Sequence, residues 1–235
     1  MDNKTVLRVG VYNNFNFTDL ELAEVGKYTD TYLPFVNSNS FVTIRGEFPS
    51  IVTINPYLNS WQEPVGDLTN LKACRVKWVE GAVADVYKAQ VEAIKWCVDR
   101  SIPVLITFMR FASRRTLLSF VTESSEHLYQ YSRSYYRLPY DQRLQALSHI
   151  REFSDNPDEL IYTCDIAGKG CPDCGNCSKL TYGVSEGGVS SLSLSCSGDA
   201  GECIFHCPDC WAKRLGRITN FKYDAVTINN KQKGE

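Results

Sequence analysis

Cysteine is the residue whose number and spacing point most directly to chemistry in this chain. The 235 residues include ten cysteines, and eight of them fall between positions 164 and 210. These eight are Cys164, Cys171, Cys174, Cys177, Cys196, Cys203, Cys207 and Cys210. Because the first residues show no secretion signal, we expect metal binding by thiolates, with a disulfide framework as the less favoured alternative for an even number of cysteines.

Two Cys-Pro-Asp-Cys repeats supply the ligands that a tetrahedral zinc site needs. The two residues inside each pair let the backbone curl so that both sulfurs face one ion, and Gly175 permits the tight turn after the first pair. The predicted zinc ligands are therefore Cys171, Cys174, Cys207 and Cys210. The other four cysteines form a second metal site or cluster, or lie buried; they are Cys164, Cys177, Cys196 and Cys203.

The order of elements around these pairs resembles a treble-clef or zinc-ribbon module. Strand-like runs at 180–184 and 189–195 predict a β-hairpin between the two pairs, and a helical pattern follows Cys210. The resemblance implies a structural zinc module that serves a binding or interaction protein, and metal binding would then contribute to the folding free energy.

A second resemblance competes for the same thiolates. The triplet Cys203-x-x-x-Cys207-x-x-Cys210 resembles the motif of radical SAM enzymes, and residues 189–195 predict the strand that should precede it. The resemblance implies a [4Fe–4S] cluster held by these cysteines, with S-adenosylmethionine on the fourth iron. The family usually has this motif near the chain start and an aromatic residue where Asp209 stands, so the resemblance requires a permuted order of strands. A looser similarity to cysteine-rich phage and mobile-element proteins implies no activity.

The elements that must position these cysteines predict an α/β core. A strand at 74–79, a helix over 84–100 and an apolar strand from 104 form a βαβ unit, the signature of a mainly parallel sheet. We expect this βα core, in which a partial or permuted barrel is one arrangement, to span residues 1–160. A cysteine-rich metal-binding module then covers 161–217, and a terminal strand and tail cover 218–235. Residues 113–153 read as helical.

Two features suggest ligands other than metal. Arg110, Arg114 and Arg115 follow an apolar strand, where α/β proteins bind anions. Residues 129–143 hold five tyrosines and three arginines, which could stack on nucleic-acid bases or pack locally at a domain edge. The net charge of −2 gives no overall pull toward nucleic acid, and the absence of a long apolar run predicts a cytoplasmic protein without a membrane partner. Nucleic acid or protein partners, and enzymatic activity, stay open.

Overall fold

The computed structural model describes residues 5–9, 29, 32–38, 48–55, 61, 63–64, 66–164, 174–183, 189–193 and 226–227. Three of the eight clustered cysteines lie in this part of the chain: Cys164, Cys174 and Cys177. The other five lie outside the described residues; they are Cys171, Cys196, Cys203, Cys207 and Cys210. The predicted boundaries at 160 and 217 therefore remain predictions.

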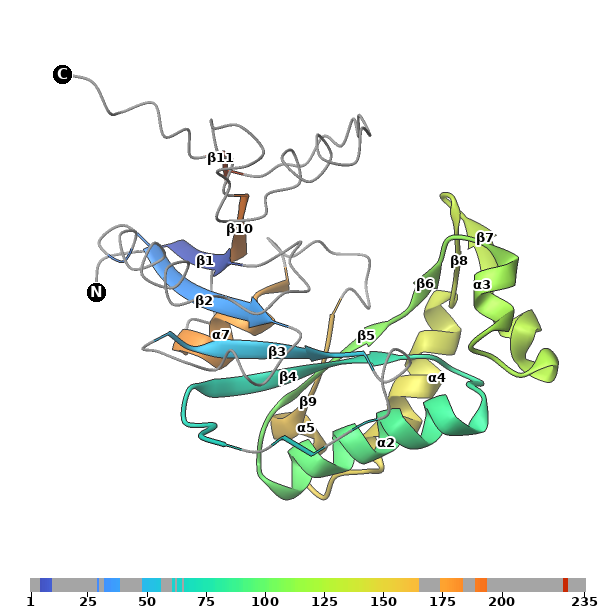
Figure 1. Ribbon diagram of the computed structural model, residues 1–235, viewed down its shortest axis with the longest axis horizontal. Coiled ribbons are helices and arrows are strands. Elements are labelled where there is room, and N and C mark those ends of the chain that lie inside the picture. Colours follow the sequence, from blue (N-terminus) through green and yellow to red (C-terminus); the bar gives the residue numbers. More distant parts are fainter. Residues whose placement is uncertain are drawn as a thin grey trace.

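Within the described residues the main sheet contains eight strands, and every pairing between them is parallel. In chain order the strands are β1 (Thr5–Val9), β2 (Tyr32–Ser38), β3 (Ser50–Ile54), β4 (Leu71–Trp78), β5 (Val104–Phe108), β9 (Ile161–Thr163), β10 (Val189–Ser193) and β11 (Val226–Thr227). Their spatial order is β11-β10-β1-β2-β3-β4-β5-β9 (Figure 1). The predicted α/β class with a parallel sheet is confirmed.

The strand order reverses at β1. The first six strands follow one another across the sheet from β1 to β9, whereas β10 and β11 lie on the other side of β1. Val6 of β1 is paired with Val189 of β10 and with Leu33 of β2. In open α/β sheets such a reversal marks the place where ligands bind, outside the carboxyl ends of the strands.

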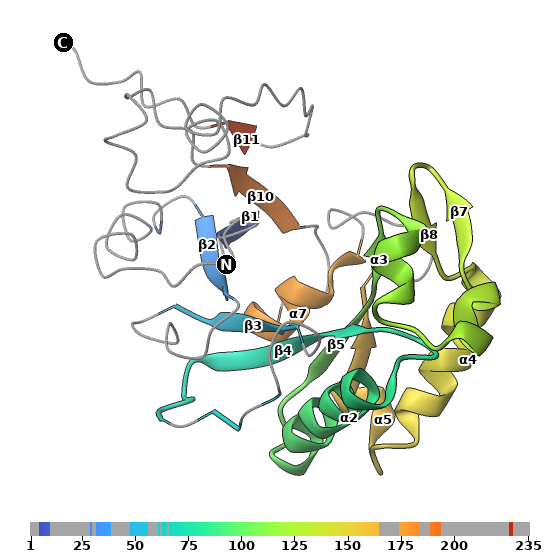
Figure 2. The same ribbon diagram turned by 45° about the vertical axis from the view of Figure 1, so that its right-hand side comes forward.

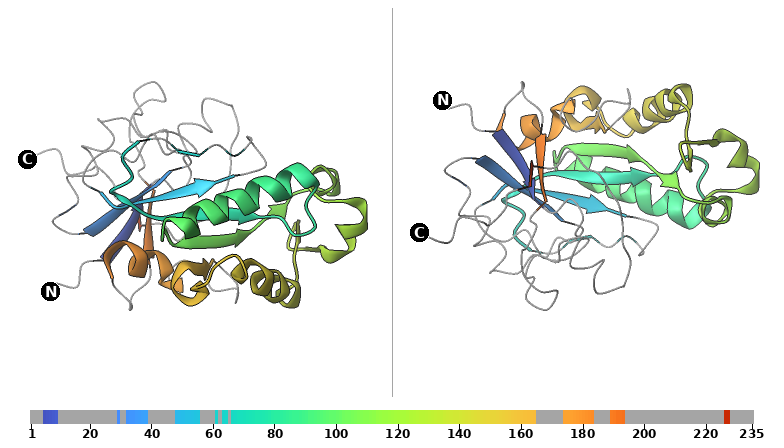
Figure 3. Two further views of the ribbon diagram at one scale, coloured as in Figure 1. Left: turned by 90° about the horizontal axis from the view of Figure 1, so that it is seen from below. Right: turned by 90° about the horizontal axis from the view of Figure 1, so that it is seen from above.

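One face of the sheet packs against helix α2 (Ala84–Asp99), as the helical spacing of its apolar residues predicts. Val76 and Trp78 of β4 and Ile94 of α2 belong to one buried core, which also receives residues of α4 (Tyr140–Arg151). Gln90, fully buried on α2, pairs its amide with both the N–H and the carbonyl of Val79, each at 3.0 Å. Seen from below, α2 lies across β4 and β5 (Figure 3).

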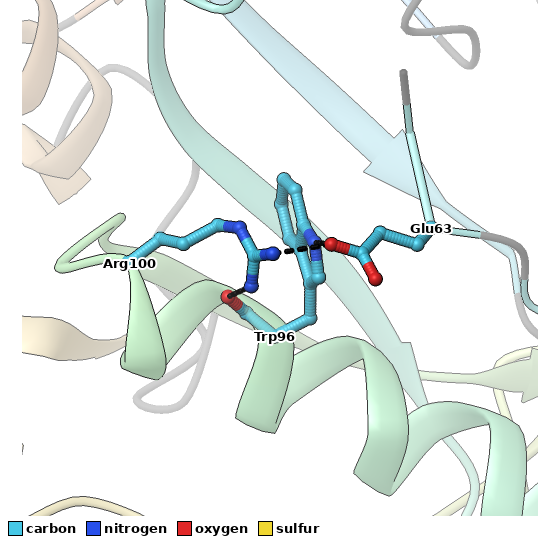
Figure 4. A network of polar contacts seen from close by, with 3 residues as sticks. All are labelled: Glu63, Trp96 and Arg100. Carbon is cyan, nitrogen blue, oxygen red and sulfur yellow. Dashed lines mark hydrogen bonds and ion pairs between the residues drawn. The ribbon is translucent and has the colours of Figure 1, made fainter.

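The segment before β4 is tied to the end of α2 by a contact network around the buried Trp96. The indole Nε1 of Trp96 donates to a carboxylate oxygen of Glu63 at 2.9 Å, and Arg100 pairs with the same carboxylate (Figure 4). The Arg100 guanidinium also lies 4.8 Å from the Trp96 ring centre. These contacts hold the segment before β4 against α2.

A second, antiparallel sheet follows β5 and corrects the helical prediction for 113–153. It has the order β6-β8-β7, with β6 (Arg110–Phe111), β7 (Gln130–Ser132) and β8 (Tyr135–Arg137). Helix α3 (Arg114–Leu118) and the 3₁₀ helix η2 (Glu123–Leu128) connect β6 to β7. The helical prediction is right for α4. It is wrong for 130–137, because tyrosine-rich segments favour strands and residues 133–134 form a tight turn.

The predicted hairpin between 180–184 and 189–195 is also wrong. Residues Asn176–Tyr182 form helix α7, and β10 pairs in parallel with β1 and β11. Gly175 and Gly183 adopt left-handed conformations, with φ of 66° and 70°, and bound the helix at its two ends. Helical spacing of Cys177, Ser178 and Thr181, which are buried, outweighs the local strand preference of 180–182.

Candidate functional site at the carboxyl ends of the strands

The sheet face opposite α2 changes from apolar to polar in the direction of the strands. Its apolar part is a small core that includes Phe35, Ile51, Ala73 and Leu105, one residue from each of β2 to β5. Two residues further along the same strands come four polar residues, which we call the polar edge: Asn37, Thr53, Arg75 and Thr107. Since alternate residues of a strand share a face, the polar edge lies on the same face as the apolar part, toward the carboxyl ends of four neighbouring strands. The register staggers its members: Thr53 is opposite Arg75, whereas Asn37 is opposite Ile51 and Thr107 is opposite Lys77.

Arg75 is the centre of the polar edge. Only 6 % of its surface is exposed, and its Nη1 donates to the Asn37 side-chain oxygen at 2.5 Å. Thr53 donates to the same oxygen at 3.4 Å. The Nη2 of Arg75 donates to the sulfur of Cys177 at 3.4 Å. Burying a guanidinium costs free energy unless polar partners surround it, so this position is built to hold a positive charge away from water.

Helix α7 covers this face on the side opposite α2 (Figure 2). Asn176 donates to the carbonyl of Thr163 at 2.9 Å, which fixes the start of α7 to the end of β9. The Tyr182 hydroxyl donates to the carbonyl of Pro34, which fixes the end of α7 to β2. Burial raises the pKa of Tyr182 to about 12, so this hydroxyl remains a donor at neutral pH. Attached at both ends, α7 shields the face from solvent.

The described cysteines of the late cluster lie around the polar edge. Cys177 is buried against Arg75, and Cys164 follows β9, where its N–H donates to the carbonyl of Ile106 at 2.8 Å. Cys174 is half-buried, directly before Gly175. The left-handed Gly175 has the conformation expected of a metal-binding turn after Cys174. A neighbouring cation favours the thiolate form of cysteine, which is the form that binds metal.

Among the residues that the structure describes, no three His, Cys, Asp or Glu side chains are gathered as a metal site would require. Of the predicted zinc ligands only Cys174 belongs to that part of the chain, and of the second predicted set only Cys164 and Cys177 do. The metal assignments for both sets therefore stay predictions.

Two hydroxyl groups near this region have unused hydrogen-bonding capacity. Ser178 is fully buried on α7, and neither its Oγ nor the buried Oγ1 of Thr107 has a hydrogen-bond partner within the described part of the chain. Buried polar atoms normally have partners, and those that lack one often face a ligand or a bound water. These hydroxyls add to the polar groups available on this side of the sheet.

The two early cysteines differ from the late cluster. Cys74 and Cys97 are fully buried in the core between α2 and the sheet. Burial raises the pKa of the Cys74 thiol well above its usual value, and the neighbouring Cys97 raises it further. This pair is therefore part of the packing, as its apolar surroundings in the sequence suggest.

The three arginines predicted to bind an anion lie in different settings. Arg114 forms a two-pronged ion pair with Glu126, whose pKa is lowered by the hydrogen bond from Arg114. Arg115 is exposed on α3. Arg110 lies on β6, directly opposite Arg137 of β8.

Sequence reasoning missed the polar edge, which holds the most deeply buried charge in the described residues of this face. The sequence pattern that could have indicated it is an apolar residue followed two positions later by a polar residue, which recurs in strands β2, β3, β4 and β5. Each strand alone shows a common pattern. The parallel register pairs Thr53 directly with Arg75, and the long Arg75 side chain reaches Asn37, which is opposite Ile51.

No described helix has the length and apolar character needed to cross a membrane. Comparisons of the chain with protein-family models, with curated proteins and with solved structures found no match. The functional argument consequently rests on the residues and on the strand order.

Proposed function

We propose that the protein is an iron–sulfur enzyme of the radical SAM type, with Cys203, Cys207 and Cys210 as the thiolate ligands of a [4Fe–4S] cluster. The observation that carries the proposal is the position of β10 as a parallel strand between β1 and β11. The resemblance to radical SAM enzymes requires a sheet strand before the motif, and β10 ends ten residues before Cys203. The zinc-module alternative relies on an antiparallel hairpin at 180–195, where the described residues form helix α7 and the parallel strand β10.

The strand order also supports the location of the proposed cluster. Residues 194–225 connect the carboxyl end of β10 to the amino end of β11. Because β10 runs parallel to β1 and the strands beyond it, this connection starts at the edge of the sheet that bears Arg75 and its neighbours. It also starts beside the reversal of strand order at β1, where α/β sheets bind ligands.

The three cysteines Cys203, Cys207 and Cys210 are suitable ligands for a [4Fe–4S] cluster. Three thiolates within eight residues match the cysteine content of a cluster with one iron left for a ligand, and iron–sulfur clusters are held by cysteine thiolates. When bound, the cluster supplies the electron that cleaves S-adenosylmethionine. The chain's own contribution is binding and positioning: Arg75, held in place by Asn37, presents a buried cation to a polar substrate, and α7 excludes water from that face.

A structural Cys₄ zinc site is the second candidate, and one observation favours it. Gly175, directly after Cys174, has the left-handed φ of 66° that a metal-binding turn uses. The ligands would be Cys171, Cys174, Cys207 and Cys210. The two candidates share Cys207 and Cys210 but differ in the remaining thiolates, which makes them separable.

The test is to purify the full chain without oxygen and to measure iron, sulfide and zinc in the protein and in two variants. The iron–sulfur proposal predicts about four irons per chain, as a [4Fe–4S] cluster holds, and an absorption shoulder in the visible range. Cys203→Ala should lose the iron, whereas Cys171→Ala should keep it. A colourless protein that loses zinc in Cys171→Ala but keeps it in Cys203→Ala would establish the zinc site instead.

Addition of S-adenosylmethionine separates a catalytic cluster from an electron carrier. With one iron lacking a protein ligand, the electron paramagnetic resonance signal of the reduced cluster should change when S-adenosylmethionine binds. An iron-loaded protein whose signal is unchanged at saturating S-adenosylmethionine would contradict the radical SAM assignment while leaving the cluster in place.

A further inference from the structure

The small sheet β6-β8-β7 places two positive charges directly opposite each other. Arg110 of β6 is the register partner of Arg137 of β8, and Gln130 of β7 is the partner of Arg137 on the other side. Side chains opposite each other in antiparallel strands are about 5 Å apart at Cβ, and like charges there repel. A sheet that carries this repulsion is suited to bind a negatively charged group.

The same face of this sheet carries a tyrosine. Tyr135 lies two residues before Arg137, so strand alternation puts both on one face, and 44 % of the Tyr135 surface is exposed. Ser132, the partner of Tyr135, accepts a hydrogen bond of 2.9 Å from Nη2 of Arg137. This bond holds the Arg137 guanidinium along the sheet surface beside the tyrosine ring.

The turn of the hairpin adds a third arginine in an unfavourable backbone conformation. Arg133 and Ser134 connect β7 to β8 and have φ of 50° and 67°. A two-residue turn with both φ values positive normally takes Asn-Gly, because side chains disfavour this region. Residues kept in such conformations occur often at functional sites. The backbone therefore presents Arg133 at the tip of the hairpin at a cost in stability.

The opposite face of the hairpin exposes a second tyrosine. Tyr131 has 63 % of its surface exposed, and its ring centre lies 5.0 Å from that of Tyr136. Tyr136 is in turn the register partner of the buried Phe111. Because Tyr131 lies on the other face of the hairpin from Arg137 and Tyr135, it provides an exposed tyrosine outside the proposed binding face.

We propose that the β6-β8-β7 sheet binds single-stranded nucleic acid, with Arg110, Arg133 and Arg137 contacting phosphates and Tyr135 stacking on a base. Charge complementarity selects an anionic partner, and the exposed tyrosine beside the arginines selects one with aromatic rings. Because the net charge of the chain is −2, the attraction is local to this sheet. The sheet follows directly from the carboxyl end of β5 and stands at one end of the molecule (Figure 1).

The experiment measures the binding of the full chain to a labelled single strand of about 20 nucleotides, long enough for several stacked bases, by fluorescence anisotropy at low and moderate salt. Arg110→Gln and Arg137→Gln should each weaken binding and reduce the slope of log affinity against log salt by about 0.7 for the lost phosphate contact. Tyr135→Ala should weaken binding by about 5- to 100-fold at both salt concentrations, the range for one stacked base.

The matched control is Lys88→Gln, which removes the same charge from the exposed surface of helix α2, outside the small sheet and outside the predicted anion-binding arginines. It should leave the affinity within about two-fold, since it touches no proposed phosphate contact. Thermal unfolding of each variant tests whether the fold persists. Tyr131→Ala, on the opposite face of the hairpin, is the control for Tyr135→Ala and should bind normally.

Three results would overturn the proposal. The first is no binding at low salt. The second is a Lys88→Gln variant that is as impaired as Arg110→Gln, because the attraction would then be a general charge effect. The third is equal binding of a poly-glutamate peptide with no loss in Tyr135→Ala, which would identify an acidic protein segment as the partner.

Discussion

The fold requires a residue without a side chain at position 81, which is glycine. It follows β4 with φ of 63°, and a Cβ atom at this position would overlap the side chain of Ser125 in η2. Its carbonyl accepts a hydrogen bond of 2.9 Å from the N–H of Thr122. Close approach of two backbone segments at this point joins the end of β4 to the segment that supports the second sheet.

Replacement of Gly81 by alanine should therefore destabilise the protein more than replacement of Gly183. Both glycines have positive φ, which costs alanine about 1 kcal/mol, but nothing lies within 4 Å of a Cβ at Gly183. The overlap in Gly81→Ala should add about 1–3 kcal/mol. The free energies of unfolding in urea compare the two variants, and equal losses would show that the overlap relaxes without cost.

Arg75 can be tested separately from the metal. Arg75→Met removes the hydrogen bonds to Asn37 and Cys177 and should lower the free energy of unfolding by about 1–3 kcal/mol, because a buried acceptor loses its charged donor. Lys88→Met is the control, since Lys88 is an exposed member of a helix ion pair with Glu92, of the kind that contributes about 0.5 kcal/mol or less. Denaturant unfolding of both variants measures the difference. A similar small effect for both would mean that Arg75 does not hold the polar edge together.

At the residue scale the sequence predicts packing better than chemistry. Burial of Val76, Ile94 and Trp96 follows from their spacing in a strand and a helix. The role of Arg75 does not, because an arginine that alternates with apolar residues is also the pattern of a half-exposed strand. Its burial depends on α7, which comes about a hundred residues later in the chain.

The hairpin β7–β8 allows a test at the scale of an element. Ser134→Gly relieves the positive φ of 67° without changing any charge, and should stabilise the protein by about 1 kcal/mol. A rise in the thermal midpoint with unchanged nucleic-acid binding is the expected result. Gly183→Ala serves as the opposite substitution at a similar φ and should lower the midpoint. A destabilised Ser134→Gly variant would mean that the serine side chain makes a contact worth more than the strain.

Elements with a strong internal pattern were predictable, and those fixed by distant partners were not. Helix α2 and strand β5 agree with the sequence because the apolar spacing, Pro103 and the β-branched run all favour the same structure. Helix α7 was predicted as a strand in its second half. Its seven residues are too few for helix propensity to decide, and contacts with β2, β4 and β9 decide instead.

At the scale of the whole molecule, the proposed metal should stabilise one part of the structure more than another. The large core joins α2, α4 and the strands through side chains between Val52 and Ile161, none of which belongs to the late cysteine cluster. Metal-free protein, prepared by chelation under reducing conditions, should therefore keep slow amide exchange in α2 and β4. Protection in α7 should be lost only if the metal is zinc held by Cys174, because the cluster proposed for Cys203, Cys207 and Cys210 has no ligand next to α7 in the sequence. Hydrogen exchange with mass spectrometry measures both regions. Loss of protection in α2 as well would show that metal organises the entire fold.

The α/β class was predictable for the whole molecule, whereas the strand order was not. A helix between two strands, the second fully apolar, predicts parallel neighbours from local pattern alone. The pairing of Val6 with Val189 joins residues 183 positions apart, and no local pattern specifies it. The candidate site depends on this pairing, because it brings the carboxyl end of β10, from which the chain continues to the late cysteines, to the same edge of the sheet as Arg75.

The same pairing has a consequence for synthesis of the chain. Strand β1 leaves the ribosome before the other strands of the sheet, and β2 can pair with one of its edges soon afterwards. Its other edge waits for β10, which is synthesised about 180 residues later. At typical translation speeds that interval lasts on the order of ten seconds or more, during which an unpaired strand edge is open to incorrect partners. The nascent chain is therefore expected to need protection from a chaperone until residue 193 has emerged.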